Sequence, residues 1–394
     1  MSAYPVSFAK PSSLAIGLMS GTSADGMDAA LVEISGSGLS TRVRQIAFLS
    51  LPYPAEVRNA ILTLAKGDRG GSHELCLFHF LMGQLSLEAC LAVCEKAGVS
   101  PSRVDFVGSH GQTLYHAPLQ EPYLGRAVRG TLQLGEPSVI SEGMGCPVVS
   151  DFRVRDLAAG GLGAPLVPYT EYLLYRSETE TVGLQNVGGI GNLTVLPKGG
   201  GLSDTIAFDT GPGNMVMDAL AERITGGALR YDEGGRIAAG ASVSPALLAF
   251  LMDDPYLEKR PPKTTGREEY GQPPYVERLI RRGRELELTL PDMLATATRF
   301  TAECVRVGVE RFLAVKPDRL IVGGGGSRNP YLLACLRDAL GVPVQTNEDL
   351  GLDSDAKEAV AFAILANERL HGICNNAPSA TGAAHPVVMG KVSL

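Results

Sequence analysis

The chain has 394 residues, of which 45% are hydrophobic and 20% charged, and its formal net charge at pH 7 is −7. This length predicts two domains, and the negative charge argues against a nucleic acid or an anionic membrane as a partner, because both attract basic proteins. Seven scattered cysteines without a Cys-x-x-Cys pair are typical of a cytoplasmic protein and not of a metal cage. No apolar run approaches the length of a membrane span.

The first predicted element, after a short tail over residues 1–13, is a strand–turn–strand. Apolar residues 14–19 and 27–34 flank a bend that reads SGTSADG. A plain hairpin needs only Asn-Gly or Asp-Gly at its turn. Backbone amides and hydroxyls of a glycine bend can surround phosphate oxygens, and Asp25 or Asp28 can hold Mg²⁺. A single such bend is slightly better interpreted as a decorated hairpin.

Two polar segments follow a predicted helix over residues 74–98, which has Gly98 as its C-cap. The loop GSHGQT carries His110, which can hydrogen-bond a sugar or be a satisfied loop histidine. The segment DFRVRD follows a strand and carries Asp151, Arg153, Arg155 and Asp156. Its arginines can clamp a carboxylate or phosphate, and an internal Asp–Arg network is at least as favoured.

A second glycine-rich bend interrupts the apolar runs of residues 181–197, TVGLQNVGGIGNLTVLP. The two bends are 188 − 21 = 167 residues apart, so each half is long enough to be a domain. We therefore expect two phosphate-binding hairpins facing one cleft, with a structural duplication as a hypothesis. The recurrent alternation of strand, glycine and helix predicts an α/β fold.

Asp209 lies at the end of a predicted strand, in the segment AFDTGPGN, just before a helix. Ligands of open α/β sheets bind at this end of the strands. An ionised carboxylate there can accept a proton from water or a sugar hydroxyl. The alternative is an aspartate that caps the next helix.

The last third of the chain begins with residues 253–290, which are rich in charge and proline and are interpreted as a surface excursion. In it, KTTGREEYG (263–271) carries Lys263, Arg267 and Glu268 and can close over a ligand, but a solvated loop is the simpler interpretation. A long helix with Pro291 in its first turn follows. IVGGGGSRNP (321–330) predicts a strand, a glycine loop on which adenine can lie, and a helix capped by Asn329. Glu358 borders an apolar helix face.

Eight of these segments, in this order, resemble the 1,6-anhydro-N-acetylmuramic acid kinases from about Ala15 to Gly382: GLMSGTSADGMD, GSHGQT, DFRVRDLAAGGLGAPLVP, NVGGIGNLTVL, FDTGPGN, PPKTTGRE, GGGGSRNPYL and EAVAFAILA. The resemblance implies the two-domain α/β fold of the sugar kinase, heat-shock ATPase and actin superfamily, with an interdomain cleft. We expect domain I over residues 1–150 plus about 370–394, and domain II over residues 151–369. Leu162 departs from the usual Gln of its loop and Ala24 from a larger apolar residue.

The resemblance also implies a reaction in which water opens the 1,6-anhydro bridge at C1 while O6 takes the γ-phosphoryl group of ATP. Asp209 would be the catalytic base, and Glu358, Asp151, Arg153, Arg155, Asp156 and His110 would bind the sugar. The ATP and phosphate contacts would come from Gly21, Thr22, Ser23, Ala24, Asp25, Gly26, Met27, Asp28, Asn186, Gly188, Gly189, Gly211, Gly213, Asn214, Gly324 and Gly325. Asp25 is the expected Mg²⁺ ligand, and the expected assembly is a cytoplasmic homodimer.

Two alternatives to this function stay open at the level of sequence. A kinase of the same fold could act on another anhydro sugar, since sugar-contacting loops change with few substitutions. A non-catalytic ATP-binding protein could use domain closure as a switch, although the presence of both Asp209 and Glu358 argues against it.

Overall fold

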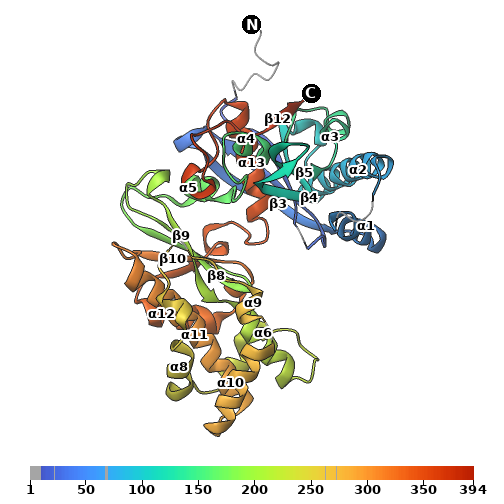
Figure 1. Ribbon diagram of the computed structural model, residues 1–394. Coiled ribbons are helices and arrows are strands. Elements are labelled where there is room, and N and C mark those ends of the chain that lie inside the picture. Colours follow the sequence, from blue (N-terminus) through green and yellow to red (C-terminus); the bar gives the residue numbers. More distant parts are fainter. Residues whose placement is uncertain (1–9, 22, 67–69, 262, 272) are drawn as a thin grey trace. The chain divides into compact units, whose positions relative to one another are not determined.

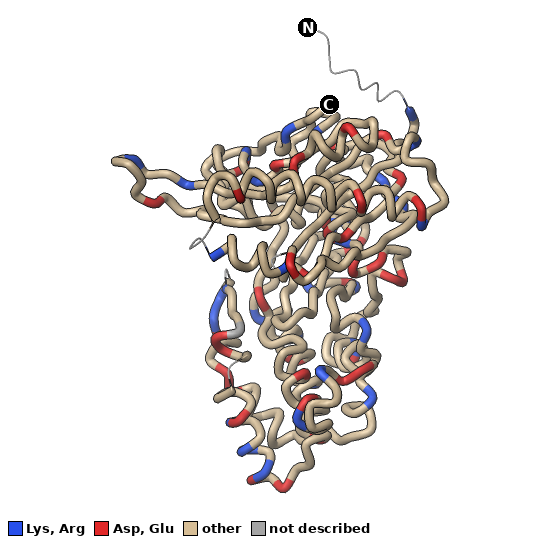
Figure 2. Tube along the Cα trace, turned by 90° about the vertical axis from the view of Figure 1, so that its right-hand side faces the viewer, with Lys and Arg blue, Asp and Glu red and all other residues tan. Residues whose placement is uncertain are grey.

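The computed structural model describes residues 10–21, 23–66, 70–261, 263–271 and 273–394, and it divides into two compact units (Figure 1). Unit 1 contains Met1–Leu174 and Gly351–Leu394, and unit 2 contains Tyr175–Leu350. Most of the expected N-terminal tail, residues 1–9, lies outside the described residues. Both basic and acidic residues are distributed along the trace of each unit (Figure 2).

Unit 1 is built on a seven-stranded mixed sheet in the order β12-β6-β4-β1-β2-β3, with β5 paired to β4. β1 and β2 form an antiparallel hairpin that β3 extends, whereas β4 runs parallel to both β1 and β6. The strands are β1 (Ser13–Ser20), β2 (Gly26–Ser35), β3 (Arg42–Pro52), β4 (Phe106–Tyr123), β5 (Arg126–Leu134), β6 (Val148–Ser150) and β12 (Lys391–Ser393).

Helices cover this sheet, and two of them pack on opposite faces of β1. Ile16 and Leu18 join the apolar cluster formed with α2. The intervening Gly17 faces α13, because successive strand residues point to opposite sides. A Cβ on Gly17 would lie 1.8 Å from the Ala359 carbonyl oxygen, so only glycine permits the close approach of α13. The helices are α1 (Ala55–Ala65), α2 (Ser72–Ala97), α3 (Pro137–Met144), α4 (Phe152–Ala158), α5 (Val167–Tyr175), α13 (Lys357–Leu370) and α14 (Pro378–Thr381).

The helix α2 corrects one sequence expectation. Among the described residues, it is long and apolar enough to cross a membrane by length and composition alone, although no such run was expected. It packs against β2, β3 and α3, and it ends at Gly98 in the left-handed conformation, as predicted. Part of its apolar surface is buried in the core of unit 1.

Unit 2 is built on a five-stranded sheet in the order β11-β10-β7-β8-β9. Its strands are β7 (Val182–Val187), β8 (Ile190–Leu196), β9 (Ile206–Pro212), β10 (Arg319–Gly323) and β11 (Val344–Thr346). β7, β8 and β9 form an antiparallel meander, and β10 runs parallel to β7 and β11. Unit 1 has the same order and directions in β6-β4-β1-β2-β3, which supports the hypothesised duplication.

The helices of unit 2 pack around α11, which contacts α6, α7, α8, α12 and β9. As expected, Pro291 lies in the first turn of α11, and Asn329 caps α12 by accepting a hydrogen bond from the Leu332 amide at 3.0 Å. The helices are α6 (Asn214–Ile224), α7 (Arg236–Ala239), α8 (Pro245–Met252), α9 (Arg267–Tyr270), α10 (Pro273–Glu285), α11 (Leu290–Phe312) and α12 (Pro330–Leu340).

Residues 253–290 are not the plain surface excursion that their composition indicated. Tyr256, Tyr270 and Leu279 are buried in the core of unit 2. The error has a physical reason: α10 carries charges on its outer face, and these outnumber the apolar residues on its inner face.

The expected α/β fold with two domains, each built on a mixed sheet, is confirmed. The division between the units falls at 174/175 and 350/351, whereas the sequence boundaries were placed at 150/151 and about 369/370. The difference arises because α4 and α13 pack with the sheet of unit 1. Gly108 of β4 resembles Gly17 in this respect, since its Cβ would lie 2.2 Å from the Phe362 carbonyl oxygen of α13.

Candidate functional site

The first glycine bend connects β1 to β2 in unit 1 and is tied to the neighbouring strand. Ser20 Oγ donates to Gln112 Oε1 at 2.6 Å and accepts from the Tyr53 hydroxyl at 2.9 Å. The Ala24 amide donates to the Gly21 carbonyl, with Ala24 at φ 53°. Thr22, an expected phosphate contact, lies outside the described residues. The bend is thus fixed at Ser20, and its polar residues Ser23 and Asp25 are exposed to solvent.

The two aspartates of this bend differ in their surroundings. Asp25 is exposed and pairs with Arg58 across 3.3 Å. Burial raises the pKa of Asp28, a hydrogen bond from Ser50 opposes this shift, and Asp355 adds to it. Within the described part of the chain, no group of three or more His, Cys, Asp or Glu side chains could hold a metal ion.

Arg153 binds His110 in unit 1, so two predicted sugar contacts come together. Arg153 donates from Nε and Nη2 to His110 Nε2, at 3.1 and 2.9 Å, and from Nη1 to the Gly163 carbonyl. Burial, and then the Arg153 charge, lower the pKa of His110 to about 3. His110 is therefore neutral near pH 7, with Nε2 as its acceptor and the ring proton on Nδ1.

Glu358 lies in the first turn of α13, where the charge of Arg153 acts on its carboxylate. Its side chain reaches solvent, yet the surrounding protein desolvates it enough to raise its pKa. Asp28 raises this pKa further, whereas Lys357 and Arg153 lower it. The Glu358 carboxylate is thus accessible to solvent, and both positive and negative side chains act on it.

Of the other three predicted residues of the segment 151–156, Asp151 lines a pocket of about 380 Å³ together with His110, whereas Asp156 and Arg155 lie elsewhere. Asp156 is fully buried and accepts hydrogen bonds from the Gly163 amide, Asn376 and Thr381, at 2.7 to 2.9 Å. This arrangement favours the internal-network alternative for Asp156. Asp151 pairs with Lys391 at 2.7 Å, and the exposed Arg155 lines a separate surface hollow.

The second glycine bend, between β7 and β8 of unit 2, contacts the start of α6. The Asn214 amide donates to the Gly188 carbonyl at 2.7 Å, and the Gly213 amide to the Gly189 carbonyl at 2.9 Å. A Cβ on Gly213 would lie 2.3 Å from the Gly188 oxygen, so this approach requires glycine. The two predicted phosphate segments thus form one structure.

The glycine loop after β10 adjoins this structure. Gly324 has φ 74°, and a Cβ on it would lie 2.7 Å from Asn186 Oδ1. Gly211 has φ 147°, and a Cβ on it would lie 3.2 Å from Cys304 Sγ. Asn186, Gly188, Gly213, Asn214 and Gly324 therefore lie close together, and their role as phosphate contacts stays a prediction.

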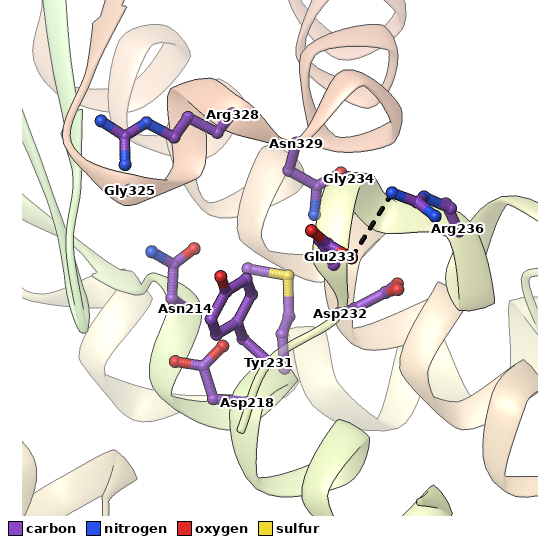
Figure 3. Close-up of a pocket in the computed structure, with 11 residues that line it drawn as sticks. Asn214, Asp218, Tyr231, Asp232, Glu233, Gly234, Arg236, Gly325, Arg328 and Asn329 are labelled. Atoms are coloured by element: carbon purple, nitrogen blue, oxygen red, sulfur yellow. Dashed lines mark hydrogen bonds and ion pairs between the residues drawn. The ribbon is translucent and has the colours of Figure 1, made fainter. Parts of the chain in front are cut away.

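A pocket of about 530 Å³ opens beside this loop in unit 2 (Figure 3). Asn214 and Gly325 line it, and both were predicted contacts. Burial raises the pKa of Asp218 in α6 to about 6. The full lining is Asn214, Met217, Asp218, Tyr231, Asp232, Glu233, Gly234, Arg236, Gly325, Arg328 and Asn329.

Most of this lining was missed by the sequence analysis, because it comes from an irregular segment around residues 231–236. Asp232 accepts from the Ile237 and Ala238 amides at 2.9 and 3.0 Å and so begins α7. Glu233 and Arg236 pair at 3.4 Å, the dashed line in Figure 3. The sequence DEGGR was the available signal, since an aspartate with two glycines close behind it is typical of a turn.

Asp209 lies on β9, the edge strand of the unit 2 sheet. Asn192 Nδ2 donates to its Oδ1 at 2.9 Å and the Thr265 amide to its Oδ2 at 3.0 Å. The following helix α6 has Gly213 as its N-cap residue. The helix-capping alternative for Asp209 is therefore not supported. A carboxylate held at both oxygens retains further lone pairs for a water or hydroxyl.

A family model described as anhydro-N-acetylmuramic acid kinase matches residues 13–394 of this chain. The chain belongs to this family. A protein of Caldanaerobacter subterraneus subsp. tengcongensis named anhydro-N-acetylmuramic acid kinase is 52% identical over 388 residues, 98% of each chain. A protein of that name from Clostridioides difficile is 41% identical over 381 residues, 96% of this chain and 97% of its own length.

The solved structures that match this chain share much less of its sequence. An activator of the 2-hydroxyisocaproyl-CoA dehydratase from Clostridium difficile with bound ADPNP has a TM-score of 0.44 and 12% identity, over 91% of this chain and 96% of its own. A ROK family glucokinase from Streptomyces griseus in complex with glucose and AMPPNP has a TM-score of 0.36 and 15% identity, over 89% and 98%.

Proposed function

We propose that this chain is an ATP-dependent kinase of peptidoglycan recycling. It opens the 1,6-anhydro ring of 1,6-anhydro-N-acetylmuramic acid and phosphorylates O6, which gives N-acetylmuramic acid 6-phosphate and ADP. Membership of the anhydro-N-acetylmuramic acid kinase family over residues 13–394 supports this activity. The structural observation that carries it is the Asp209 carboxylate, fixed at both oxygens on the edge strand of unit 2.

The reaction needs one proton acceptor. Asp209 takes a proton from water as the water oxygen bonds to C1 of the sugar. The C1–O6 bond breaks, O6 bonds to the γ-phosphorus, and ADP leaves. Two fixed hydrogen bonds from Asn192 and Thr265 orient the carboxylate before the sugar arrives, so little reorganisation remains for the reaction itself. A positioned general base typically contributes a factor of roughly 10²–10⁴ in rate.

The unit 2 pocket is assigned to the nucleoside of ATP. Its volume of about 530 Å³ is in the range of small-molecule sites. Bare backbone at Gly325 gives a flat group a surface to lie on, and the ionised form of Asp218 can accept hydrogen bonds from ribose hydroxyls. Amides of the converging glycine segments at Gly188, Gly213 and Gly324 are suited to phosphate oxygens.

The bend over residues 20–28 of unit 1 is assigned to phosphate and Mg²⁺ binding. Carboxylate oxygens suit Mg²⁺, which is usually held by one or two carboxylates together with substrate phosphates and water. Asp25 and Asp28 supply carboxylate oxygens of this kind. Bound Mg²⁺ would neutralise charge on the phosphates. Asp25 is exposed, and its Oδ1 pairs with Arg58 at 3.3 Å.

Sugar binding is assigned to Glu358, His110 and Arg153 of unit 1. Glu358 has an accessible carboxylate for sugar hydroxyls, and the neutral His110 is held in one orientation by Arg153. Asp156 is assigned a structural role, because its carboxylate is fully used inside unit 1. The enzyme is further proposed to be a cytoplasmic homodimer. All seven cysteines are free, which agrees with a reducing compartment.

ATP turnover with and without the anhydro sugar tests this function. The expected product carries a 6-phosphate and, when the reaction runs in ¹⁸O-labelled water, one labelled oxygen at C1. Stimulation only by a different anhydro sugar would move the assignment to another substrate. Slow ATP hydrolysis that ignores every sugar would instead identify an ATP-dependent switch and end the kinase assignment.

A further inference from the structure

The segment of residues 263–265 holds the backbone and the side chain of Asp209 at the same time. The Asp209 amide donates to the Lys263 carbonyl at 3.2 Å, and the Thr265 amide donates to Asp209 Oδ2 at 3.0 Å. β9 is an edge strand, so this irregular segment takes the place of the missing neighbour strand. The direction of the carboxylate is therefore coupled to the position of three loop residues, which we call the clamp segment.

Lys263 is the most buried side chain of the clamp segment, although the sequence favoured a solvated loop. Its exposed fraction is 6%. Its Nζ lies 4.5 Å from the ring centre of Tyr256, 4.7 Å from that of Phe312 and 5.8 Å from that of Phe208. Nζ also donates to the Tyr256 carbonyl at 3.4 Å. These three rings form a cage around the ammonium group.

Such a cage is an unusual place for a lysine, because burial of an ammonium group away from water is costly. Desolvation accordingly lowers the pKa of Lys263. Attraction to the ring faces offsets part of this cost, because a cation–π contact is stronger when it is desolvated. An apolar side chain would fill the cage without that cost. The lysine therefore calls for an explanation beyond packing.

The cage is connected to Asp209 by its own residues. Phe208 precedes Asp209 on β9, and Tyr256 donates from its hydroxyl to the Asp209 carbonyl at 2.8 Å. An ammonium group fixed against Phe208 and Tyr256 thus fixes the Lys263 backbone relative to the strand that carries the carboxylate.

We propose that Lys263 is a positioning residue for the catalytic base. Its caged ammonium group anchors the clamp segment to β9 and so aims the Thr265 amide at Asp209 Oδ2. This role rests on the assignment of Asp209 as the base. Lys263 acts through Asp209, and no contact with a substrate is needed.

The other end of the clamp segment has a second anchor at the surface. Glu269 of α9 accepts from Thr265 Oγ1 at 3.1 Å and from the Gly266 amide at 2.9 Å. Because Glu269 is exposed, its removal does not open the core. This residue offers a way to loosen the clamp segment while the aromatic cage stays intact.

The test compares Lys263→Ala with Lys259→Ala. Lys259 is exposed, and its Nζ lies 5.4 Å from the same Tyr256 ring, so it is a matched control. We expect Lys263→Ala to lower kcat about tenfold to a hundredfold, because a small misplacement of a catalytic group has effects of that size. The KM values for ATP and for sugar should stay within about twofold, and Lys259→Ala should leave kcat unchanged.

A double-mutant cycle separates positioning from a general loss of folded enzyme. If Lys263 acts through Asp209, then Lys263→Ala should add no further loss in an Asp209→Asn background. An equal loss in both backgrounds would overturn the role, as would a kcat for Lys263→Ala within twofold of the unmodified enzyme. Near-normal turnover by Asp209→Asn alone would instead refute the assignment of the base.

Glu269→Ala keeps the question decidable if Lys263→Ala does not fold. A several-fold lower kcat for Glu269→Ala, absent in the Asp209→Asn background, supports the clamp. An unchanged kcat for Glu269→Ala overturns it.

Discussion

Asp218 gives the sharpest prediction, because the same burial that suits a binding pocket should destabilise the fold. The pKa of this carboxyl group is raised from 3.8 to about 6 by burial. The folded state therefore favours the protonated form. Stability from this group is fully present below pH 3.8 and is lost as the pH rises toward 6. Asp218→Asn keeps a neutral side chain of similar shape at every pH, so it should be more stable than the unmodified protein at pH 7.

The size of this effect follows from the shift. Two pKa units correspond to about 3 kcal/mol. Asp218 is only partly buried, and solvent screening reduces the figure, so we expect about 1–2 kcal/mol at pH 7 and no difference near pH 3 to 4. Urea unfolding of both proteins at a series of pH values measures it. Glu222→Gln, an exposed carboxylate on the same helix, is the control.

Nucleotide affinity should change in the opposite sense. If ribose hydroxyls donate to ionised Asp218, the KM for ATP should rise in Asp218→Asn at pH 7. It should also rise in the unmodified enzyme as the pH falls below about 6. An Asp218→Asn protein with the same stability as the unmodified one at pH 7 would refute the burial argument. Gained stability with an unchanged KM for ATP would remove Asp218 from the nucleoside site.

Three further predictions follow from contacts described above. Asp209→Asn should fold and bind ATP yet lose at least about 10² in kcat, the effect of a missing base; near-normal turnover would exclude Asp209 from that role. Glu358→Ala should raise the KM for sugar and leave nucleotide affinity nearly unchanged, and titration of each ligand separately would expose the reverse pattern if the assignment is wrong. Gly17→Ala should lower the free energy of unfolding by at least about 2 kcal/mol, because its Cβ would lie 1.8 Å from the Ala359 carbonyl oxygen; Gly71→Ala, where nothing lies within 4 Å, is the control for urea unfolding, and an equal cost at both positions would contradict the packing argument.

Local patterns in the sequence were sufficient to predict the hairpins and the helix ends. The two glycine bends connect antiparallel strands as expected, and Gly98 and Asn329 end and begin the helices for which they were named. Each of these features depends on a few consecutive residues, since a left-handed glycine or a side-chain cap acts within one turn.

The parts of the site that sequence reasoning missed depend on contacts between distant segments. Asn192 faces Asp209 only because β8 and β9 pair in a particular register, 17 residues apart. The interpretation of Lys263 as a solvated residue was wrong because aromatic rings from three separate elements surround it. No pattern in a short window encodes such an enclosure. Asp156 is similar, because its partners Asn376 and Thr381 lie more than 200 residues along the chain.

The order of the chain has a consequence for its synthesis. Unit 1 is completed by α13, which lies on β1 and β4 through Gly17 and Gly108, yet α13 is translated only after all of unit 2. From Leu174 to Leu370 the ribosome must add 370 − 174 = 196 residues, which takes about 10–40 s at ordinary rates of elongation. During that interval the nascent unit 1 sheet lacks the helix that packs on β1 and β4, so a chain stalled before residue 357 should be a strong client for chaperones that bind exposed apolar strands.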